Sequence, residues 1–131
     1  MILLDTHVWF WLAAAPHELS TRAAGAIKEA TSSGGIAVAS ISLLELARML
    51  ARGRVQARGT PEATLTDLID STSVIVKEIT PTIAALAVHL PDDFPRDPAD
   101  RLIAATARAE GLTLVTKDAG IRESHAVRTV W

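Results

Sequence analysis

The chain has 131 residues, no cysteine and a net charge of −2, with a pI near 6.0. The lack of cysteine excludes disulfides, thiolate metal sites and a cysteine nucleophile, and the length suits a single domain that we expect to span 1–131. Because nucleic-acid-binding proteins are often basic overall, contact with nucleic acid here requires a local basic patch or bound metal ions.

The first third of the chain predicts two strands separated by two helices. Residues 2–4 are an apolar run that suits a buried parallel strand, and residues 8–14 suit a short helix. Ser20 is a favourable N-cap for a second helix over 21–30, because its hydroxyl can accept a bond from a free backbone N–H. Serine and glycine residues then end this helix, and the apolar run 36–39 predicts a second strand.

The middle of the chain predicts two more helices and a third strand. Ser42 is positioned to cap a helix that runs to about residue 51. Thr60 followed by Pro61 is typical of an N-cap and the first helical residue, so the next helix begins there and ends near residue 70. The apolar residues 74–76 predict a strand.

The last third predicts two helices and one or two strands. Thr80-Pro81 repeats the capping pattern and opens a helix that ends near residue 90. After a loop, Asp97-Pro98 opens a helix that ends at Glu110-Gly111. Residues 112–115 predict a fourth strand, and the tail at 126–130 can supply a fifth.

Strands that alternate with helices predict an α/β fold with three layers, in which helices flank a central parallel sheet of four to five strands. No apolar run approaches the roughly 20 residues of a membrane span. The apolar stretch at 8–15 also lacks the preceding basic residues of a signal peptide. The sequence therefore predicts a soluble cytoplasmic protein without membrane contact.

Acidic side chains recur where the predicted strands end. Asp5 directly follows the first strand, Glu45 lies one helical turn beyond the second, and Asp118 lies three residues beyond the fourth. Asp97 and Asp100 begin the helix that leads into the fourth strand, so they lie at the edge where that strand ends. Because ligands of open parallel sheets bind at this edge, we expect the acids to converge there.

Each of these acids also has a structural interpretation. The aspartates stand at or near the starts of predicted helices, where a carboxylate can cap the first turn or interact with the helix dipole. Glu45 follows Ser42 at the spacing of a capping box. Taken singly, each acid is better explained as structural, but capping does not explain why several of them share one edge of the sheet.

Carboxylates that lie together repel one another, and little compensating base is expected there, with Arg101 and Lys117 as the candidates. A bound Mg²⁺ or Mn²⁺ removes this repulsion, and oxygen ligands without cysteine suit such a hard cation. The ion polarises a phosphate, activates water and stabilises the leaving oxygen. The sequence therefore predicts a divalent-metal centre for phosphodiester hydrolysis.

A basic segment follows Glu45. Arg48, Arg52, Arg54 and Arg58 occur there with no acid among them, and Arg48 and Arg52 are four residues apart, so they share a helix face. Phosphates of RNA, or an acidic partner, are candidates to bind these arginines. The alternative is a solvated helix end, where the dipole favours arginine.

The start of the chain also carries His7 and the aromatic run Trp9-Phe10-Trp11. His7 follows Asp5 by two residues, and we expect a packing or hydrogen-bonding role for it, with a role in the acidic site as the alternative. The aromatic residues are expected to divide between the core and a surface that faces a partner, since large aromatics favour interfaces.

Four blocks of the sequence resemble those of PIN-domain ribonucleases, and they occur in the order of that family. The blocks are ILLDTH with Asp5, SLLELA with Glu45, RDPADRLIAATA with Asp97 and Asp100, and LVTKD with Asp118. Together they span nearly the whole chain. The short length resembles the VapC toxins of bacterial toxin–antitoxin pairs.

This resemblance implies a PIN-like fold and an endoribonuclease that depends on Mg²⁺ or Mn²⁺. Asp5, Glu45, Asp100 and Asp118 match the acidic quartet, which the resemblance identifies as catalytic and metal-binding. Asp97 is an additional acid one turn before Asp100. We favour Asp100 as the direct ligand and Asp97 as a cap or supporting group of the metal site.

The resemblance also implies supporting residues and partners. Thr116, with Thr6, is expected to hold a neighbouring carboxylate or a water of the site. The implied substrate is RNA, and the arginines Arg48, Arg52 and Arg54 are the candidates to contact it. The implied partners are a second copy in a homodimer and a cognate VapB-type antitoxin, whose tail blocks the acidic site.

Two alternative functions remain open at this point. In a Mg²⁺-dependent phosphohydrolase Asp5 would act as a covalent nucleophile, although such sites usually have a second aspartate where this chain has His7. In a non-catalytic PIN-like module the domain would only bind RNA or protein. The presence of all four acidic blocks argues against loss of the site.

Overall fold

The computed structural model describes residues 1–56 and 59–131. In chain order its elements are β1 (Ile2–Leu4), α1 (Thr6–Ala14), the 3-10 helix η1 (Pro16–Glu18), α2 (Thr21–Ser33), β2 (Ile36–Ala39), α3 (Ile41–Ala51), α4 (Pro61–Thr72), β3 (Ile75–Lys77), α5 (Pro81–Val88), α6 (Pro98–Ala109), β4 (Thr113–Val115), α7 (Ala119–Ser124) and β5 (Thr129–Val130). The predicted strands at the two ends and in the middle of the chain are therefore confirmed, including the fifth.

The strands form a parallel sheet in the order β3-β2-β1-β4-β5. The central strand β1 pairs with β2 on one side and with β4 on the other, with Leu4 opposite both Val38 and Val115. The chain therefore builds the sheet in one direction from β1 to β3 and in the other from β4 to β5. The change of direction lies between β1 and β4, and such a switch point opens a crevice at the C-terminal ends of the strands.

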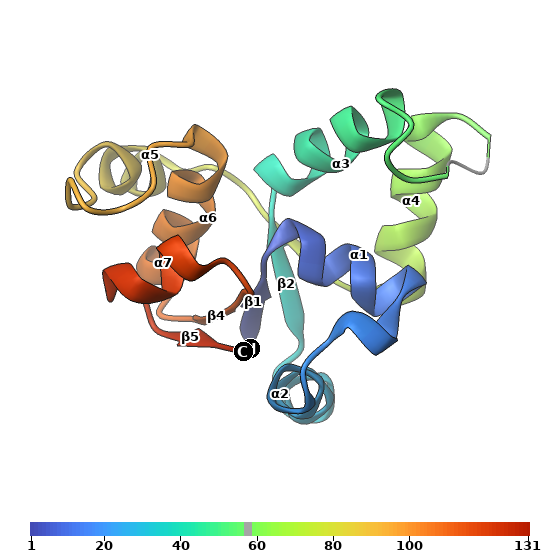
Figure 1. The fold of residues 1–131 in the computed structure, drawn as a ribbon, viewed down its shortest axis with the longest axis horizontal. Helices are drawn as coiled ribbons and strands as arrows, with labels where there is room; N and C mark the ends of the chain where they lie inside the picture. The colour runs from blue at the N-terminus through green and yellow to red at the C-terminus, as the bar shows by residue number, and fades with distance from the viewer. Residues whose placement is uncertain (57–58) are drawn as a thin grey trace.

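Helices cover both faces of the sheet, so the predicted three-layer α/β/α fold is confirmed (Figure 1). Successive strand residues point to opposite faces. Leu4 packs in one core with Trp9, among residues of α1, α2 and α4, whereas Leu3 packs in the other with residues of α6 and α7. Helix α5 packs against the outer side of α6.

Most of the predicted helix starts are correct. Ser20, Thr60 and Thr80 each accept a bond from the backbone N–H three residues ahead, and a proline follows both threonines. Asp97 likewise accepts from the N–H of Ala99. Capping side chains and proline at the first helical position thus located four of the helix starts.

Three details of the predicted helices were wrong. Helix α1 begins at Thr6, two residues earlier than expected, because Asp5 caps it. Helix α2 continues to Ser33, since the hydroxyls of Ser32 and Ser33 donate to carbonyl oxygens of the preceding turn and so fit within a helix. Helix α3 begins at Ile41, which places Ser42 inside the helix and not at its cap.

No helix in the described ranges 1–56 and 59–131 is long and apolar enough to cross a membrane.

Candidate active site

Asp5 lies at the switch point of the sheet, where β1 passes into α1. Its backbone N–H continues the pairing with β4 by donating to the carbonyl oxygen of Val115 over 3.0 Å. One carboxylate oxygen accepts from the N–H of Thr6 at 2.8 Å, and the other accepts from the Thr116 hydroxyl at 2.6 Å. Asp5 is only 9% exposed, so these two bonds hold a nearly buried carboxylate in a fixed orientation.

Thr6 connects the start of α1 to helix α3. Its hydroxyl oxygen lies 2.8 Å from Oγ of Ser42 and 2.5 Å from Oε1 of Glu45. Because a threonine hydroxyl has one proton, it donates to the stronger acceptor, the Glu45 carboxylate, and the Ser42 hydroxyl supplies the proton of the other bond. The capping-box interpretation of Glu45 is therefore wrong: Ser42 is buried and both residues bind Thr6.

Thr116 links Asp5 to Asp118. The Thr116 hydroxyl donates to Asp5 and accepts from the backbone N–H of Asp118 at 3.1 Å. Asp118 caps α7, since its side chain accepts from the N–H of Ile121 at 2.9 Å. A Cβ at Gly120 would lie 3.1 Å from Pro95 and 3.2 Å from the Asp118 carboxylate, so a side chain at this position would crowd the contact between α7 and the loop before α6.

Asp97 and Asp100 reach the same region from the start of α6. Asp97 is the exposed N-cap residue, and Asp100 is half-buried in the first helical turn. The predicted capping role of Asp97 is therefore confirmed. Asp97 also lines the same pocket as Asp100, so capping and a place in the site are not exclusive.

These side chains surround a cavity of about 370 Å³, called here the acidic pocket. Its lining is Asp5, His7, Val8, Trp11, Glu45, Asp97, Asp100, Lys117 and Asp118. The structure thus brings together all five acids that the sequence singled out, from four separate segments of the chain. In the described part of the chain, both ion pairs lie elsewhere, so no basic side chain neutralises a pocket carboxylate directly.

The crowding of carboxylates shifts their titration. Burial raises the pKa of Asp100 to about 7, with further increases from the charges of Asp97, Asp5, Asp118 and Glu45. Burial also raises the pKa of Asp5, although the bonds from Thr116 and Thr6 oppose the shift. The pKa of Glu45 is also raised, because the effect of burial outweighs the opposing effect of its hydrogen bond from Thr6. The pocket is therefore short of positive charge when its carboxylates are ionised.

The donor set of the pocket fits a hard divalent cation. All five candidate ligands are carboxylates, and oxygen donors are those that Mg²⁺ and Mn²⁺ prefer. Within residues 1–56 and 59–131, no three acidic or histidine side chains lie close enough together to hold a metal ion as they stand. Binding a cation would therefore require carboxylates to move toward a common point, and the charge of the cation would offset the repulsion between them.

The two basic residues expected near the acids differ in position. Arg101 turns away from the pocket, where it donates to the carbonyl oxygens of Ala87 at 3.2 Å and Leu90 at 3.1 Å and lies 5.9 Å from the ring of Phe94. Arg101, one of the two candidates, therefore does not compensate the acids. Lys117 does line the pocket and is exposed.

Trp11 lines the acidic pocket, which the sequence did not indicate, and so does His7, for which a role in the site was the alternative. The His7 ring also packs against Trp11, with centroids 5.9 Å apart, and its side chain is exposed at the pocket. His7 lies one helical turn before Trp11 on α1. Its position two residues after Asp5 was the signal in the sequence that it lies near the site. The aromatic run divides as expected between the core, where Trp9 is fully buried, and the surface.

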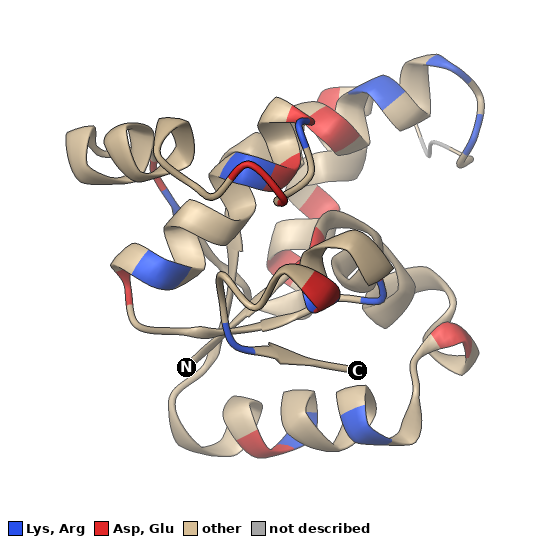
Figure 2. Cartoon of the chain, turned by 60° about the vertical axis from the view of Figure 1, so that its left-hand side comes forward, with Lys and Arg blue, Asp and Glu red and all other residues tan. Residues whose placement is uncertain are grey.

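The basic segment lies at the far end of α3 and beyond it. Arg48, Arg52 and Arg54 are exposed, and Figure 2 shows basic residues toward the end of α3 and in the segment that leads to the grey trace. Arg58 lies outside the described residues. Glu45, Arg48 and Arg52 are three and four residues apart, so one face of α3 carries the pocket glutamate and then two arginines.

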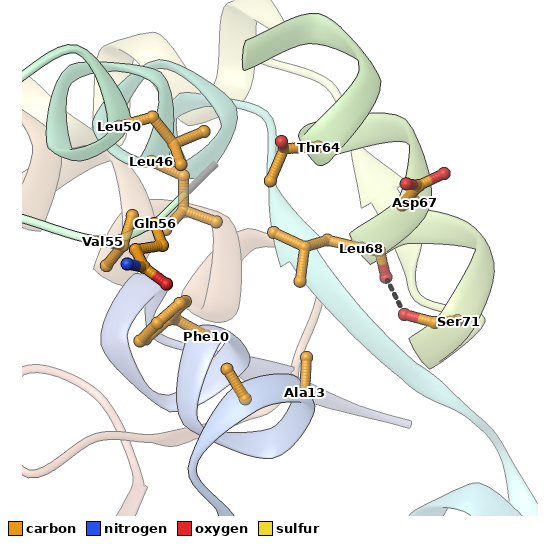
Figure 3. Close-up of a pocket in the computed structure, with 11 residues that line it drawn as sticks. Phe10, Ala13, Leu46, Leu50, Val55, Gln56, Thr64, Asp67, Leu68 and Ser71 are labelled. Atoms are coloured by element: carbon orange, nitrogen blue, oxygen red, sulfur yellow. Dashed lines mark hydrogen bonds between the residues drawn. The ribbon is translucent and has the colours of Figure 1, made fainter. Parts of the chain in front are cut away.

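A second and larger hollow, of about 530 Å³, lies between α1, α3 and α4 (Figure 3). Its lining is Phe10, Ala13, Ala14, Leu46, Leu50, Val55, Gln56, Thr64, Asp67, Leu68 and Ser71. Among the described residues of this lining, Asp67 is the one ionisable side chain, so they offer no set of groups for acid–base or metal chemistry. The acidic pocket is therefore the candidate active site, although it is the smaller of the two.

Comparison with known proteins agrees with this geometry. A profile of the PIN domain matches residues 2–125. Ribonuclease VapC22 of Mycobacterium tuberculosis is 44% identical over 132 residues, which cover 99% of this chain and 98% of that protein. Among solved structures, VapBC2 of Rickettsia felis bound to a promoter DNA fragment gives a TM-score of 0.74 at 19% identity, covering 99% of this chain and 98% of that chain. DNA-bound VapBC of Salmonella typhimurium gives 0.69 at 22%, with the same coverage of 99% and 98%.

Proposed function

Because this chain belongs to the PIN-domain family, we propose that it is a metal-dependent endoribonuclease that hydrolyses RNA phosphodiester bonds as the toxin of a toxin–antitoxin pair. The observation that carries the proposal is the acidic pocket, where carboxylates from four segments of the chain meet at the switch point of the sheet. The whole-chain similarity to a ribonuclease named VapC supports the same activity.

We propose Mg²⁺ as the cofactor of this site, with Mn²⁺ as the alternative. Asp5, Asp100, Asp118 and Glu45 would hold the ion, and Asp97 would support it as the cap of α6. When bound, the ion would polarise the phosphodiester and stabilise charge that develops on its oxygens.

The chain's own residues prepare the site before any ligand is bound. Thr116 orients Asp5 and links it to Asp118, and Thr6 orients Glu45. Both threonines are buried, so the hydrogen bonds that they donate hold Asp5 and Glu45 in defined orientations before a ligand is bound. The half-buried Asp100, with a pKa near 7, takes up a proton or a cation more readily than an ordinary aspartate.

Arg48, Arg52 and Arg54 are proposed to bind the phosphates of RNA along α3, since arginine forms strong bonds with phosphate. Arg48 and Arg52 continue the helix face that places Glu45 at the pocket, and Arg54 follows the end of the helix. An extended RNA strand can therefore run from the pocket along this face.

The proposed partners are a cognate VapB-type antitoxin and a second copy of the chain in a homodimer. Solved relatives with the same fold are VapBC complexes, which supports an antitoxin partner. We further propose that residues 1–131 form one domain, because one sheet takes strands from both ends of the chain, and that the protein acts in the cytoplasm. Light scattering of the purified chain, alone and with the antitoxin, measures both associations.

The geometry disfavours the two alternative functions. Both carboxylate oxygens of Asp5 accept hydrogen bonds in a nearly buried position, which does not suit a nucleophile that must attack a phosphorus atom. A non-catalytic module has no need for crowded, unneutralised carboxylates that destabilise the fold. In the proposed nuclease, a bound cation would neutralise the crowded carboxylates, and Asp5 would serve as a fixed ligand and not as the attacking group.

The test is cleavage of total cellular RNA by the purified, antitoxin-free protein with Mg²⁺ or Mn²⁺, or with EDTA. Discrete fragments are expected only with the metal, and Asp5→Asn is expected to abolish them while the fold is kept. Asp93→Asn, which changes an exposed loop acid outside the pocket, is the matched control and should cleave like the wild type. Equal cleavage by the Asp5→Asn protein would refute the proposed centre.

A further inference from the structure

Helix α1 sends its three consecutive aromatic residues to three different environments. Trp9 is fully buried in the core, where its indole N–H donates to the Thr72 hydroxyl at 2.9 Å. Phe10 lines the apolar hollow between α1, α3 and α4. Trp11 alone lines the acidic pocket, and His7 lies one turn before it on the same helix face.

Trp11 is held in a cluster that leaves aromatic and basic surface next to the carboxylates. Its ring is tilted by 50° against His7 and by 52° against Trp131, with centroids 5.9 Å apart in both pairs. The ammonium group of Lys117 lies 5.7 Å from the Trp11 ring centroid, within the range of a cation–π contact. Trp11 and Trp131 are half-buried, whereas His7 and Lys117 are exposed.

Trp11, His7 and Lys117 form one wall of the acidic pocket, called here the aromatic wall. Its tryptophan ring and ammonium group supply no ligand for Mg²⁺, so holding a metal ion does not explain them. The aromatic wall has the composition of a surface that binds single-stranded nucleic acid, in which aromatic rings stack on bases and a nearby cation meets the backbone. A base lies next to its own phosphate, so a phosphodiester held at the carboxylates places the adjoining base beside this wall.

We infer that Trp11, with His7, forms a stacking platform for a base next to the phosphodiester in the acidic pocket, and that Lys117 contacts an adjoining phosphate. The inference rests on the proposed function, because the acidic pocket must receive RNA. Trp11 is a positioning residue in this arrangement, since it binds a base and not the reacting atoms. Lys117 also places positive charge in the lining of a pocket whose carboxylates repel the RNA backbone.

The experiment measures binding of a short fluorescein-labelled single-stranded RNA by fluorescence anisotropy, in the Asp5→Asn background so that the probe stays intact. Stacking on one base is expected to be worth about 10-fold or more in Kd, so Trp11→Leu should weaken binding by that factor. Trp11→Phe keeps an aromatic face and should recover part of the loss. Phe10→Leu, the neighbouring half-buried aromatic outside the acidic pocket, is the matched control and should bind like the parent.

A set of RNAs with one abasic position each separates stacking from a merely structural role of Trp11. In the parent, loss of one particular base should weaken binding, and that penalty should disappear in the Trp11→Leu protein. A structural role would weaken all RNAs alike and leave the penalty in place. Lys117→Met should reduce the salt dependence of binding without removing the abasic penalty.

Several outcomes would overturn the inference. One is unchanged RNA affinity in the Trp11→Leu protein. Another is an abasic penalty that Trp11→Leu does not remove. A third is a Trp11→Leu protein that binds a protein partner more weakly but binds RNA as tightly as the parent does. The proposed nuclease function fails independently, if the wild type shows the Trp11-dependent penalty but cleaves no RNA with Mg²⁺ or Mn²⁺.

Discussion

Replacing Asp100 with asparagine should stabilise the metal-free protein, because burial and the charges of four other carboxylates disfavour an ionised Asp100. A carboxyl group with a pKa of about 7 in the folded chain and 3.8 in the unfolded chain costs about 4 kcal/mol of folding free energy at pH 7. Asp100 is partly exposed, so solvent screening reduces this to about 2 kcal/mol. The substitution also loses about 0.5 kcal/mol of interaction with the dipole of α6.

The net expectation is a free energy of unfolding about 1 to 2 kcal/mol higher for the Asp100→Asn protein, measured by urea denaturation in EDTA at pH 7. Because the folded-state pKa is raised, the penalty in the wild type develops as the pH rises above 3.8 and is nearly complete above about 7. The difference between the two proteins should therefore shrink as the pH falls from 7 toward 4. Asp93→Asn, in the exposed loop, should show no such difference.

Addition of Mg²⁺ or Mn²⁺ should reverse the order. A ligand that binds only the folded state stabilises it according to its concentration and Kd, and the Asp100→Asn protein lacks one of the proposed ligands. The wild type should therefore gain more stability from the metal than the variant. A less stable Asp100→Asn protein in EDTA would refute the argument that the ionised Asp100 carboxylate destabilises the metal-free fold, and equal gains from the metal would refute its role as a ligand.

Three further changes test other parts of the account. Thr116→Val removes the bonds to Asp5 and to the N–H of Asp118, so chemical denaturation should show a loss of about 2 kcal/mol, which Thr116→Ser should restore. Arg101→Met removes two bonds to carbonyl oxygens and should lower stability by about 1 to 3 kcal/mol with unchanged metal affinity; a large change in metal affinity would place Arg101 in the site. Arg52→Glu should weaken RNA binding and lower the salt slope of log K by about 1, and an unchanged slope would move the RNA path elsewhere.

The sheet and the meeting of the acids followed from local patterns. Short apolar runs located the strands, and Asp5 and Asp118 follow two strands that prove to be neighbours across the switch point. Position relative to strand ends was therefore enough to place these carboxylates at one edge. Most helix starts were equally predictable, because capping residues and proline act within a few residues of each other.

Contacts between distant segments were not predictable in the same way. The sequence shows Ser42 and Glu45 at a capping-box spacing, but tertiary packing brings Thr6 to both of them. Arg101 lies one residue from Asp100, and the turn of α6 still directs it to carbonyl oxygens of α5 and the following loop. The pairing of Trp11 with Trp131 joins the two ends of the chain, and no local pattern indicates it.

The metal site itself is the central claim, and titration with Mn²⁺, followed by electron paramagnetic resonance, tests it most directly. The account predicts saturable binding to the wild type and to the Asp93→Asn protein, and affinity at least about 10-fold weaker in the Asp5→Asn and Asp100→Asn proteins. Failure of the folded wild type to bind Mn²⁺, or equal affinity in all four proteins, would contradict a metal centre built from these carboxylates.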